Sequence, residues 1–342
     1  MKKIISFLNT DIKIINSYFL FTIVLIILVC IGYSSYALFS FTKTSTNVIE
    51  ATVGDLSTIG TDTLIKLTNN QNNSGLYTIT HEADTTLQMG TNESITEYRY
   101  RGASPKNYVT FNNEVWRIIG IFPTDDGTGK IENRIKIIRN ESIGNKYWNT
   151  TRVASTSNRN NWTGATLKTE LNGTYLNALS STTQNMIGNT KYYLGGYANS
   201  LQIQKDVMYQ YERKIKNTTK YSEFYYEANP NSWVGKLALM YASDYGYAVS
   251  DECTVNLYNY DNTTCKNNNW LFKGNNEWLL PQYALSASGG GYAFLVNSYG
   301  RVTYEGRVSG DQFAVRPVLY LNPDVKITGG NGTSANPYTL GL

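Results

Sequence analysis

The chain has 342 residues, of which 41% are hydrophobic and 16% are charged, and its formal net charge is +4. This length and apolar content describe a globular protein that can bury a substantial core. The basic residues are spread along the chain rather than clustered, so the charge does not indicate a nucleic-acid-binding protein. The 28 Tyr residues, against 11 Phe, suit an extracellular recognition surface, although an AT-rich genome would produce the same bias.

The first structural feature is an uncharged apolar segment, Phe19 to Phe39. As a helix, residues 19–39 are long enough to cross a hydrocarbon core of about 30 Å. Because three lysines precede the segment, residues 1–18 are expected in the cytoplasm and the rest of the chain outside, as in a single-pass protein of the cell membrane. Cleavage after Ala37, where Ser35 and Ala37 form a small-x-small site, is the open alternative and would release a secreted protein.

Residues 40–97 are rich in Thr, Asn and Ser and contain few aromatic residues. We expect a polar stalk with two weak strands, around Leu64–Leu67 and Leu76–His81, rather than a packed domain. His81 is the only histidine of the chain, and in such a segment it is expected to be a solvated side chain. Since the folded region then lacks a histidine, Ser-His-Asp and Cys-His catalysis are not predicted.

Residues 98–342 are expected to form the folded extracellular domain. Two strands flank Asn112-Asn113 in YVTFNNEVWRIIGIF, and the turn DDGTG leads to a third strand in NRIKIIRNES. Apolar residues at every fourth position from Leu167 to Leu179 predict a helix. Short strands with a helix or two between them indicate the α+β class.

The C-terminal segment Trp278–Leu321 contains three strand candidates, YAFLVN, RVTYEG and FAVRPVLYL, separated by turns rich in Gly and Ser. Arg316 lies inside the last of them. A buried arginine needs a carboxylate or carbonyl partner, so we expect a structural role for Arg316. The segment as a whole is expected to close the fold as a small sheet.

Two cysteines, Cys253 and Cys265, lie in the expected extracellular domain, whereas Cys30 lies in the apolar segment. An exported location favours a disulfide between the first two, and a closed loop of this size stabilises a fold by about 3 kcal/mol. Two free thiols are the alternative. A zinc site is not predicted, because zinc takes four ligands and the only histidine lies far upstream.

Four carboxylates bracket the cysteine loop, namely Asp244, Asp251, Glu252 and Asp261. Carboxylates and backbone carbonyls are the ligands of calcium, but the spacing matches no EF-hand loop. Ordinary loop carboxylates are therefore expected and no cofactor is assigned, although the sequence leaves calcium binding by these four residues open.

All six Trp residues lie in the expected domain. Trp116 and Trp278 have apolar neighbours and are expected in the core. Trp148 and Trp162 lie in Asn-rich segments, where an exposed indole could stack on a sugar ring. We therefore predict that these two contribute to ligand binding.

Several motifs in order resemble an uncharacterised domain of Gram-positive surface proteins: WRIIGIF, IKIIRNESIG, LALMYASDYGYA, AVRPVLYLNP and GGNGTSANPYTL. The last part also resembles the Fibrobacter-type major paralogous domain and, more distantly, the C-type-lectin-like fold shared with formylglycine-generating enzymes, with Val315-Arg316-Pro317 matching a strand pattern of that fold. The resemblance covers residues 98–342. It implies a small antiparallel sheet, one or two helices and long loops.

The sequence departs from this superfamily in two respects. The catalytic cysteine pair of formylglycine-generating enzymes has no match, because Cys253 and Cys265 precede the C-terminal segment, so that activity is not carried over. The calcium-lectin motifs of the Glu-Pro-Asn and Trp-Asn-Asp types are also absent.

We therefore predict a membrane-anchored surface module that binds a glycan or protein ligand and is not an enzyme. The predicted ligand-binding residues are Trp148, Trp162, Tyr283, Ser286, Tyr292, Tyr304, Arg307 and Asp311. One alternative is a structural component of the envelope or of a surface appendage. Another is a surface enzyme that uses carboxylates among Asp244, Glu252, Glu277 and Asp311.

Overall fold

The computed structural model describes residues 59–342 except residues 91, 151–159, 198–201, 216–229 and 284–290. These residues belong to one unit, which spans Ser57–Leu342. The predicted membrane segment, Phe19 to Phe39, lies outside the described residues. Within the part that is described, no helix is long and apolar enough to cross a membrane.

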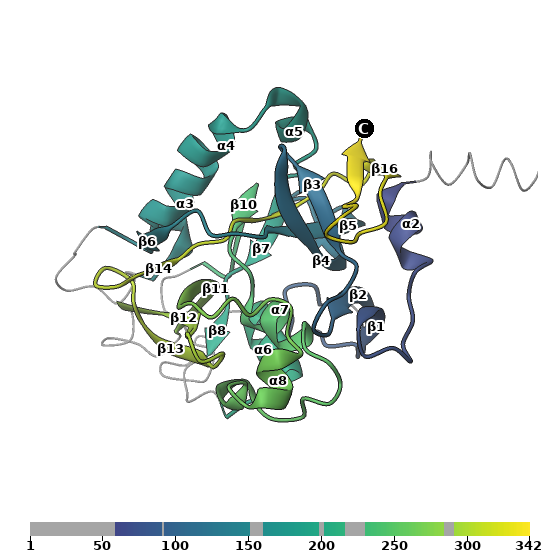
Figure 1. The fold of residues 1–342 in the computed structure, drawn as a ribbon. Coiled ribbons are helices and arrows are strands. Elements are labelled where there is room, and N and C mark those ends of the chain that lie inside the picture. The colour runs from purple at the N-terminus through teal and green to yellow at the C-terminus, as the bar shows by residue number, and fades with distance from the viewer. Residues whose placement is uncertain (1–58, 91, 151–159, 198–201, 216–229, 284–290) are drawn as a thin grey trace, which may run out of the picture. The chain divides into compact units, whose positions relative to one another are not determined.

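The larger of two main sheets has seven strands, all antiparallel, in the order β1-β2-β4-β5-β15-β10, with β3 paired to β4 (Figure 1). Ile118, Ile121, Ile135 and Ile137 of its two long strands are buried, because β-branched residues fit a covered, pleated surface. The strands are β1 (Gly75–His81), β2 (Ile95–Arg101), β3 (Tyr108–Phe111), β4 (Glu114–Asp125), β5 (Ile131–Arg139), β10 (Leu237–Ala238) and β15 (Val318–Tyr320).

The hairpin predicted at Asn112-Asn113 is confirmed as the turn between β3 and β4. Both residues have positive φ, 54° and 59°, the left-handed conformation that a two-residue hairpin turn requires. Asn adopts this conformation more readily than most residues. The predicted third strand is β5, which pairs with β4 across the DDGTG turn.

The second main sheet has six strands, in the order β13-β12-β11-β14-β6, with β8 paired to β11. It is mixed, since β11 runs parallel to both β14 and β8. Its strands are β6 (Asn145–Tyr147), β8 (Gly196–Tyr197), β11 (Glu277–Tyr283), β12 (Tyr292–Val296), β13 (Val302–Arg307) and β14 (Gln312–Ala314). Two further sheets have two antiparallel strands each, β7 (Thr190–Tyr193) with β9 (Ser232–Gly235), and β16 (Lys326–Gly329) with β17 (Thr339–Gly341).

The helices are short. The helix predicted from Leu167 to Leu179 is confirmed as α3 (Thr166–Glu170), a π-helical turn (Leu171–Tyr175) and α4 (Leu176–Ala178), and its leucines are buried. The others are α2 (Gly60–Ile65), α5 (Ser181–Asn185), α6 (Lys205–Arg213), α7 (Ala242–Tyr247) and α8 (Thr263–Asn267), with 3-10 turns at Trp162–Gly164 and Leu257–Asn259. Mostly antiparallel sheets with few helices place the protein in the α+β class, as predicted.

The candidate strand FAVRPVLYL divides between the two sheets. Its first part is β14 and its second part is β15, and Arg316 lies between them with 2% of its surface exposed. The Arg316 guanidinium donates hydrogen bonds of 2.8 and 2.9 Å to the Glu277 carboxylate and one of 2.7 Å to the Leu271 carbonyl. The predicted structural role of Arg316 is confirmed, and the ion pair ties β11 to the crossing between the sheets.

The folded unit begins earlier than predicted. β1 pairs with β2 along seven residues, from Gly75↔Arg101 to His81↔Ile95, and Leu64 of α2 is fully buried. The described residues from Ile59 to Glu97 therefore belong to the folded unit and not to the predicted stalk of residues 40–97. The strand predicted around Leu76–His81 is confirmed as β1, whereas the strand predicted around Leu64–Leu67 is wrong, because Leu64 and Ile65 end helix α2. The Thr- and Asn-rich composition concealed that β1 belongs to the larger sheet, since β1 lies at the edge of that sheet and places few apolar side chains in the core.

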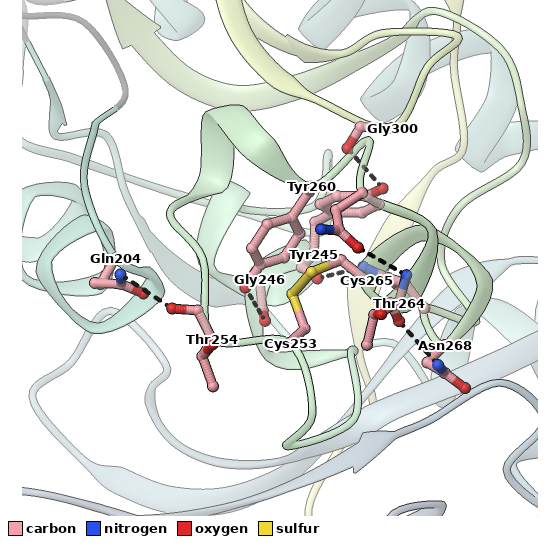
Figure 2. The surroundings of a disulfide bond; sticks show 12 residues. Gln204, Tyr245, Gly246, Cys253, Thr254, Tyr260, Thr264, Cys265, Asn268 and Gly300 are labelled. Atoms are coloured by element: carbon pink, nitrogen blue, oxygen red, sulfur yellow. Dashed lines mark hydrogen bonds between the residues drawn. A yellow bond between two sulfur atoms is a disulfide. The ribbon is translucent and has the colours of Figure 1, made fainter.

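The predicted disulfide between Cys253 and Cys265 is present, with both residues buried. Figure 2 shows Tyr245 and Tyr260 beside the bond. The Tyr260 hydroxyl donates to the Gly246 carbonyl, so the disulfide loop is attached to α7.

Loss of this disulfide is expected to destabilise the unit by about 3 kcal/mol, because the unfolded chain regains the entropy of an open loop. The double variant Cys253→Ala with Cys265→Ala should show this loss in urea denaturation monitored by Trp fluorescence. The wild-type protein in reductant is the matched control and should behave like the variant. An unchanged unfolding midpoint in both samples would contradict the prediction.

Candidate functional site

A network of buried charges joins β2 and β5 to α6 and α7. Three of its members are cations and three are carboxylates, so the formal charges balance. At most 3% of the surface of each residue is exposed. The six residues are Glu97, Arg99, Lys136, Glu212, Arg213 and Asp244.

Asp244, in the first turn of α7, is the centre of the network. It accepts hydrogen bonds from Lys136 Nζ at 2.5 Å, from Arg99 Nη1 at 3.0 Å and from the Tyr241 backbone N–H at 2.9 Å. Burial raises the pKa of Asp244, but Lys136 and Arg99 outweigh this and hold the pKa below its ordinary value. Burial lowers the pKa of Lys136 to about 8, even though Asp244 opposes the shift.

Glu97 forms the outer part of the network. Its carboxylate accepts from Arg99 Nε and Nη2 at 2.9 and 2.8 Å and from the Tyr209 hydroxyl at 3.0 Å. His81 Nε2 lies 3.2 Å from the same carboxylate. Burial raises the pKa of Glu97, but Arg99 and His81 more than offset it, so the pKa lies below its ordinary value and Glu97 is ionised at neutral pH.

The structure corrects the prediction that His81 is a solvated side chain. Its side chain is only 10% exposed, and its ring stacks on Tyr209 with centroids 3.7 Å apart and planes within 3°. The Arg213 guanidinium lies over the same Tyr209 ring at 3.7 Å. The sequence contained a signal that His81 is not solvated. Tyr77, Ile79 and His81 are alternate residues of β1, so His81 lies on the same face of the strand as two apolar side chains.

A cavity of about 380 Å³ lies beside His81, between the end of β1 and helix α6. This volume is within the range of small-molecule binding sites. Among the described residues that line it, three are carboxylates and none is Lys or Arg. The carboxylates are Glu82, Asp84 and Asp206, and the aromatic rings are those of His81, Tyr209 and Tyr247.

Trp148 and Trp162 are not exposed as predicted for sugar-binding platforms. They are 0% and 2% exposed, with ring centroids 5.2 Å apart in an edge-to-face arrangement. Trp148 also meets Trp278 at 5.8 Å. Their large apolar area, rather than the Asn-rich sequence around them, determines that they lie in the core beside Trp278.

Other predicted ligand-binding residues are brought together on strands β11 to β13. Tyr283 and Tyr304 stack with centroids 4.4 Å apart, and both are partly exposed. Tyr292 lies opposite Arg307 in the β12–β13 register, and Arg307 forms a 2.7 Å ion pair with Asp311. Ser286 lies outside the described residues. Binding of a ligand by this surface of strands β11 to β13 stays a prediction. None of its described residues lines the cavity beside His81.

The carboxylates considered for calcium each have a different partner. Asp244 pairs with Lys136 and Arg99, Asp251 with Arg101, and Asp261 with Arg301, whereas Glu252 accepts from Asn73. Over the described part of the chain, no group of three or more His, Cys, Asp or Glu side chains could hold a metal ion. For the enzyme alternative, Asp244, Glu277 and Asp311 likewise form ion pairs with cations of the fold.

No protein-family model, curated protein or solved structure matches this chain. The resemblance to Gram-positive surface-protein domains therefore stays a prediction.

Asp244→Asn is expected to destabilise the fold by about 3–5 kcal/mol, because it removes one charge from a buried pair and leaves Lys136 without its counter-ion. Glu114→Gln is the matched control, since Glu114 pairs with Arg139 at 2.9 Å but is about one third exposed. Its loss should be below about 1 kcal/mol. Urea denaturation of both variants measures the difference, and equal losses would contradict the role of burial.

Stability is expected to fall as the pH drops below about 4.5, because Glu97 and Asp244 have lowered pKa values in the folded state. The unfolded chain takes up protons at these carboxyls first, so acid favours unfolding. Glu212 opposes the trend, since burial raises its pKa. Urea titrations between pH 3 and 7 should show a shallower acid dependence for Glu97→Gln than for the wild type, and parallel curves would contradict the assignment.

Proposed function

We propose that the folded unit is a cell-surface binding module that recognises a glycan through the cavity beside His81. The observation that carries this proposal is a cavity of about 380 Å³ that is lined by three carboxylates and by aromatic rings. We call the part of the lining formed by His81 and Tyr209 the base of the cavity. Carboxylates accept hydrogen bonds from sugar hydroxyls, and the face of an aromatic ring offers an apolar contact to a sugar ring.

The buried network supports binding by holding the base of the cavity in place. His81 is fixed by its contact with Glu97 and by stacking on Tyr209, whose hydroxyl also bonds Glu97. A ligand that meets side chains already held in one arrangement loses less entropy on binding. Such preorganisation suits recognition.

Location at the cell surface is part of the same proposal. It is supported by the apolar segment Phe19 to Phe39 and by the Cys253–Cys265 disulfide, since disulfides persist in oxidising compartments. Assignment to the C-type-lectin-like fold is also proposed. Its support is the order of the sequence motifs together with antiparallel sheets and few helices.

A glycan array followed by calorimetry on the purified full-length protein tests the proposal. His81→Ala should weaken binding about tenfold, equivalent to about 1.4 kcal/mol. Gln210→Trp should block binding sterically, because Gln210 is an exposed lining residue whose replacement need not disturb the core. Thermal unfolding checks that both variants are folded.

Tyr299→Ala is the control, since Tyr299 is 69% exposed and does not line the cavity. It should bind like the wild type. Tyr304→Ala tests the surface of strands β11 to β13 instead. The proposal is wrong if no glycan binds, or if Tyr304→Ala removes binding while Gln210→Trp leaves it intact.

A further inference from the structure

The lining of the cavity beside His81 indicates the kind of sugar that would fit, an inference that rests on the function proposed above. We infer that the cavity selects a glycan carrying a free, protonated amine, that is, an amino sugar without an acetyl group. The hydrogen-bonding groups that line the cavity are mainly acceptors, and some of them already have partners within the fold.

Glu97 determines which nitrogen of the neutral His81 ring carries the proton. Glu97 is held as a carboxylate by Arg99 and can only accept hydrogen bonds. His81 Nε2, 3.2 Å from Glu97, must therefore carry the proton of this contact. In the neutral ring the other nitrogen, Nδ1, is then an acceptor, and no described residue donates a hydrogen bond to it. The base of the cavity thus presents a hydrogen-bond acceptor.

The carboxylates of the lining have few partners among the described residues. Glu82 and Asp206 make no hydrogen bond or ion pair with any described residue, while Asp84 accepts from the Thr86 hydroxyl and N–H through one oxygen. The Tyr209 hydroxyl donates to Glu97, so toward a ligand it can only accept a hydrogen bond. The charged groups of the lining are consequently three carboxylates, beside the acceptor nitrogen of His81.

The cations near the cavity have other partners or do not line it, so the lining keeps its negative charge. Arg99 and Arg213 are paired with Glu97 and Glu212 within the buried network. Lys205 lies over the Tyr247 ring at 5.4 Å and near enough to Asp206 to interact with its charge, and Lys214 lies close enough to contribute to lowering the pKa of Asp84. Neither lysine lines the cavity.

A protonated amine fits this arrangement best. An ammonium group provides three donors and one positive charge, whereas a hydroxyl provides one donor and no charge. An acetamide has lost both the charge and two of the donors. The ammonium pairs with the carboxylates of the lining through charge-assisted hydrogen bonds, and an uncharged acetamide loses this attraction.

The shape of the site favours a sugar ring over a basic peptide. The stacked rings of His81 and Tyr209 both line the cavity and offer an aromatic surface, and a cavity of about 380 Å³ holds a compact ring. An extended peptide would place only the end of one lysine side chain in it. We therefore assign the amine to an amino sugar.

Calorimetry on the full-length protein with two matched probes tests this inference. The probes are oligomers of glucosamine and of N-acetylglucosamine of equal length, at the same pH and ionic strength. The glucosamine oligomer should bind at least tenfold more tightly. Asp206→Asn should reduce the ratio of the two affinities about threefold or more, because it removes a negative charge from the lining and preserves the shape of the side chain.

Asp324→Asn is the matched control, since Asp324 is exposed and does not line the cavity, and it should leave the ratio unchanged. Equal binding of both oligomers, lost in Gln210→Trp, would overturn the inference while leaving the proposed function standing. Binding of neither oligomer nor of any other glycan would overturn both. Tighter binding of a lysine oligopeptide than of either sugar oligomer would also overturn the inference, because the ligand would then be a basic peptide and not an amino sugar.

Discussion

The structure depends on the burial of Asp244 between Lys136 and Arg99. Two cations around one buried carboxylate would leave an excess positive charge, and Glu97 and Glu212 balance Arg99 and Arg213. An unpaired charge in a protein interior costs several kcal/mol, so these groups must assemble together. Since they come from β2, β5, α6 and α7, their pairing fixes how the two helices pack on the larger sheet.

This constraint also explains why the cavity lies where it does. The network ends at Glu97, one oxygen of which faces Tyr209 and the other His81. Stacking of His81 on Tyr209 then joins the end of edge strand β1 to helix α6, and the cavity lies between them. The base of the cavity is the outer surface of a buried ionic core.

The parts of this fold that local patterns determine could be predicted. The Asn112-Asn113 turn, the helix beginning near Leu167 and the Cys253–Cys265 disulfide depend on residues close together in the chain. For Arg316 the sequence predicted the kind of partner, a carboxylate or a carbonyl, because a buried guanidinium needs a hydrogen-bond acceptor. The network of buried charges could not be predicted, since Arg99 and Asp244 are 145 positions apart and no periodicity relates them. The site at His81 was missed for the same reason: its surroundings come from α6, and its own strand reads as a polar segment.

The ionic core also determines the hydrogen-bonding character of the cavity. Arg99 keeps Glu97 ionised and an ionised carboxylate can only accept, so the neutral form of His81 must direct its N–H toward Glu97 and keep Nδ1 as an acceptor. A neutral residue such as Gln at position 97 could donate as well as accept, and the orientation of the imidazole proton would no longer be fixed. Charges that have no contact with the cavity thus decide whether its base accepts or donates a hydrogen bond. Because the same charges hold β2, β5, α6 and α7 together, this property cannot be changed without altering the core.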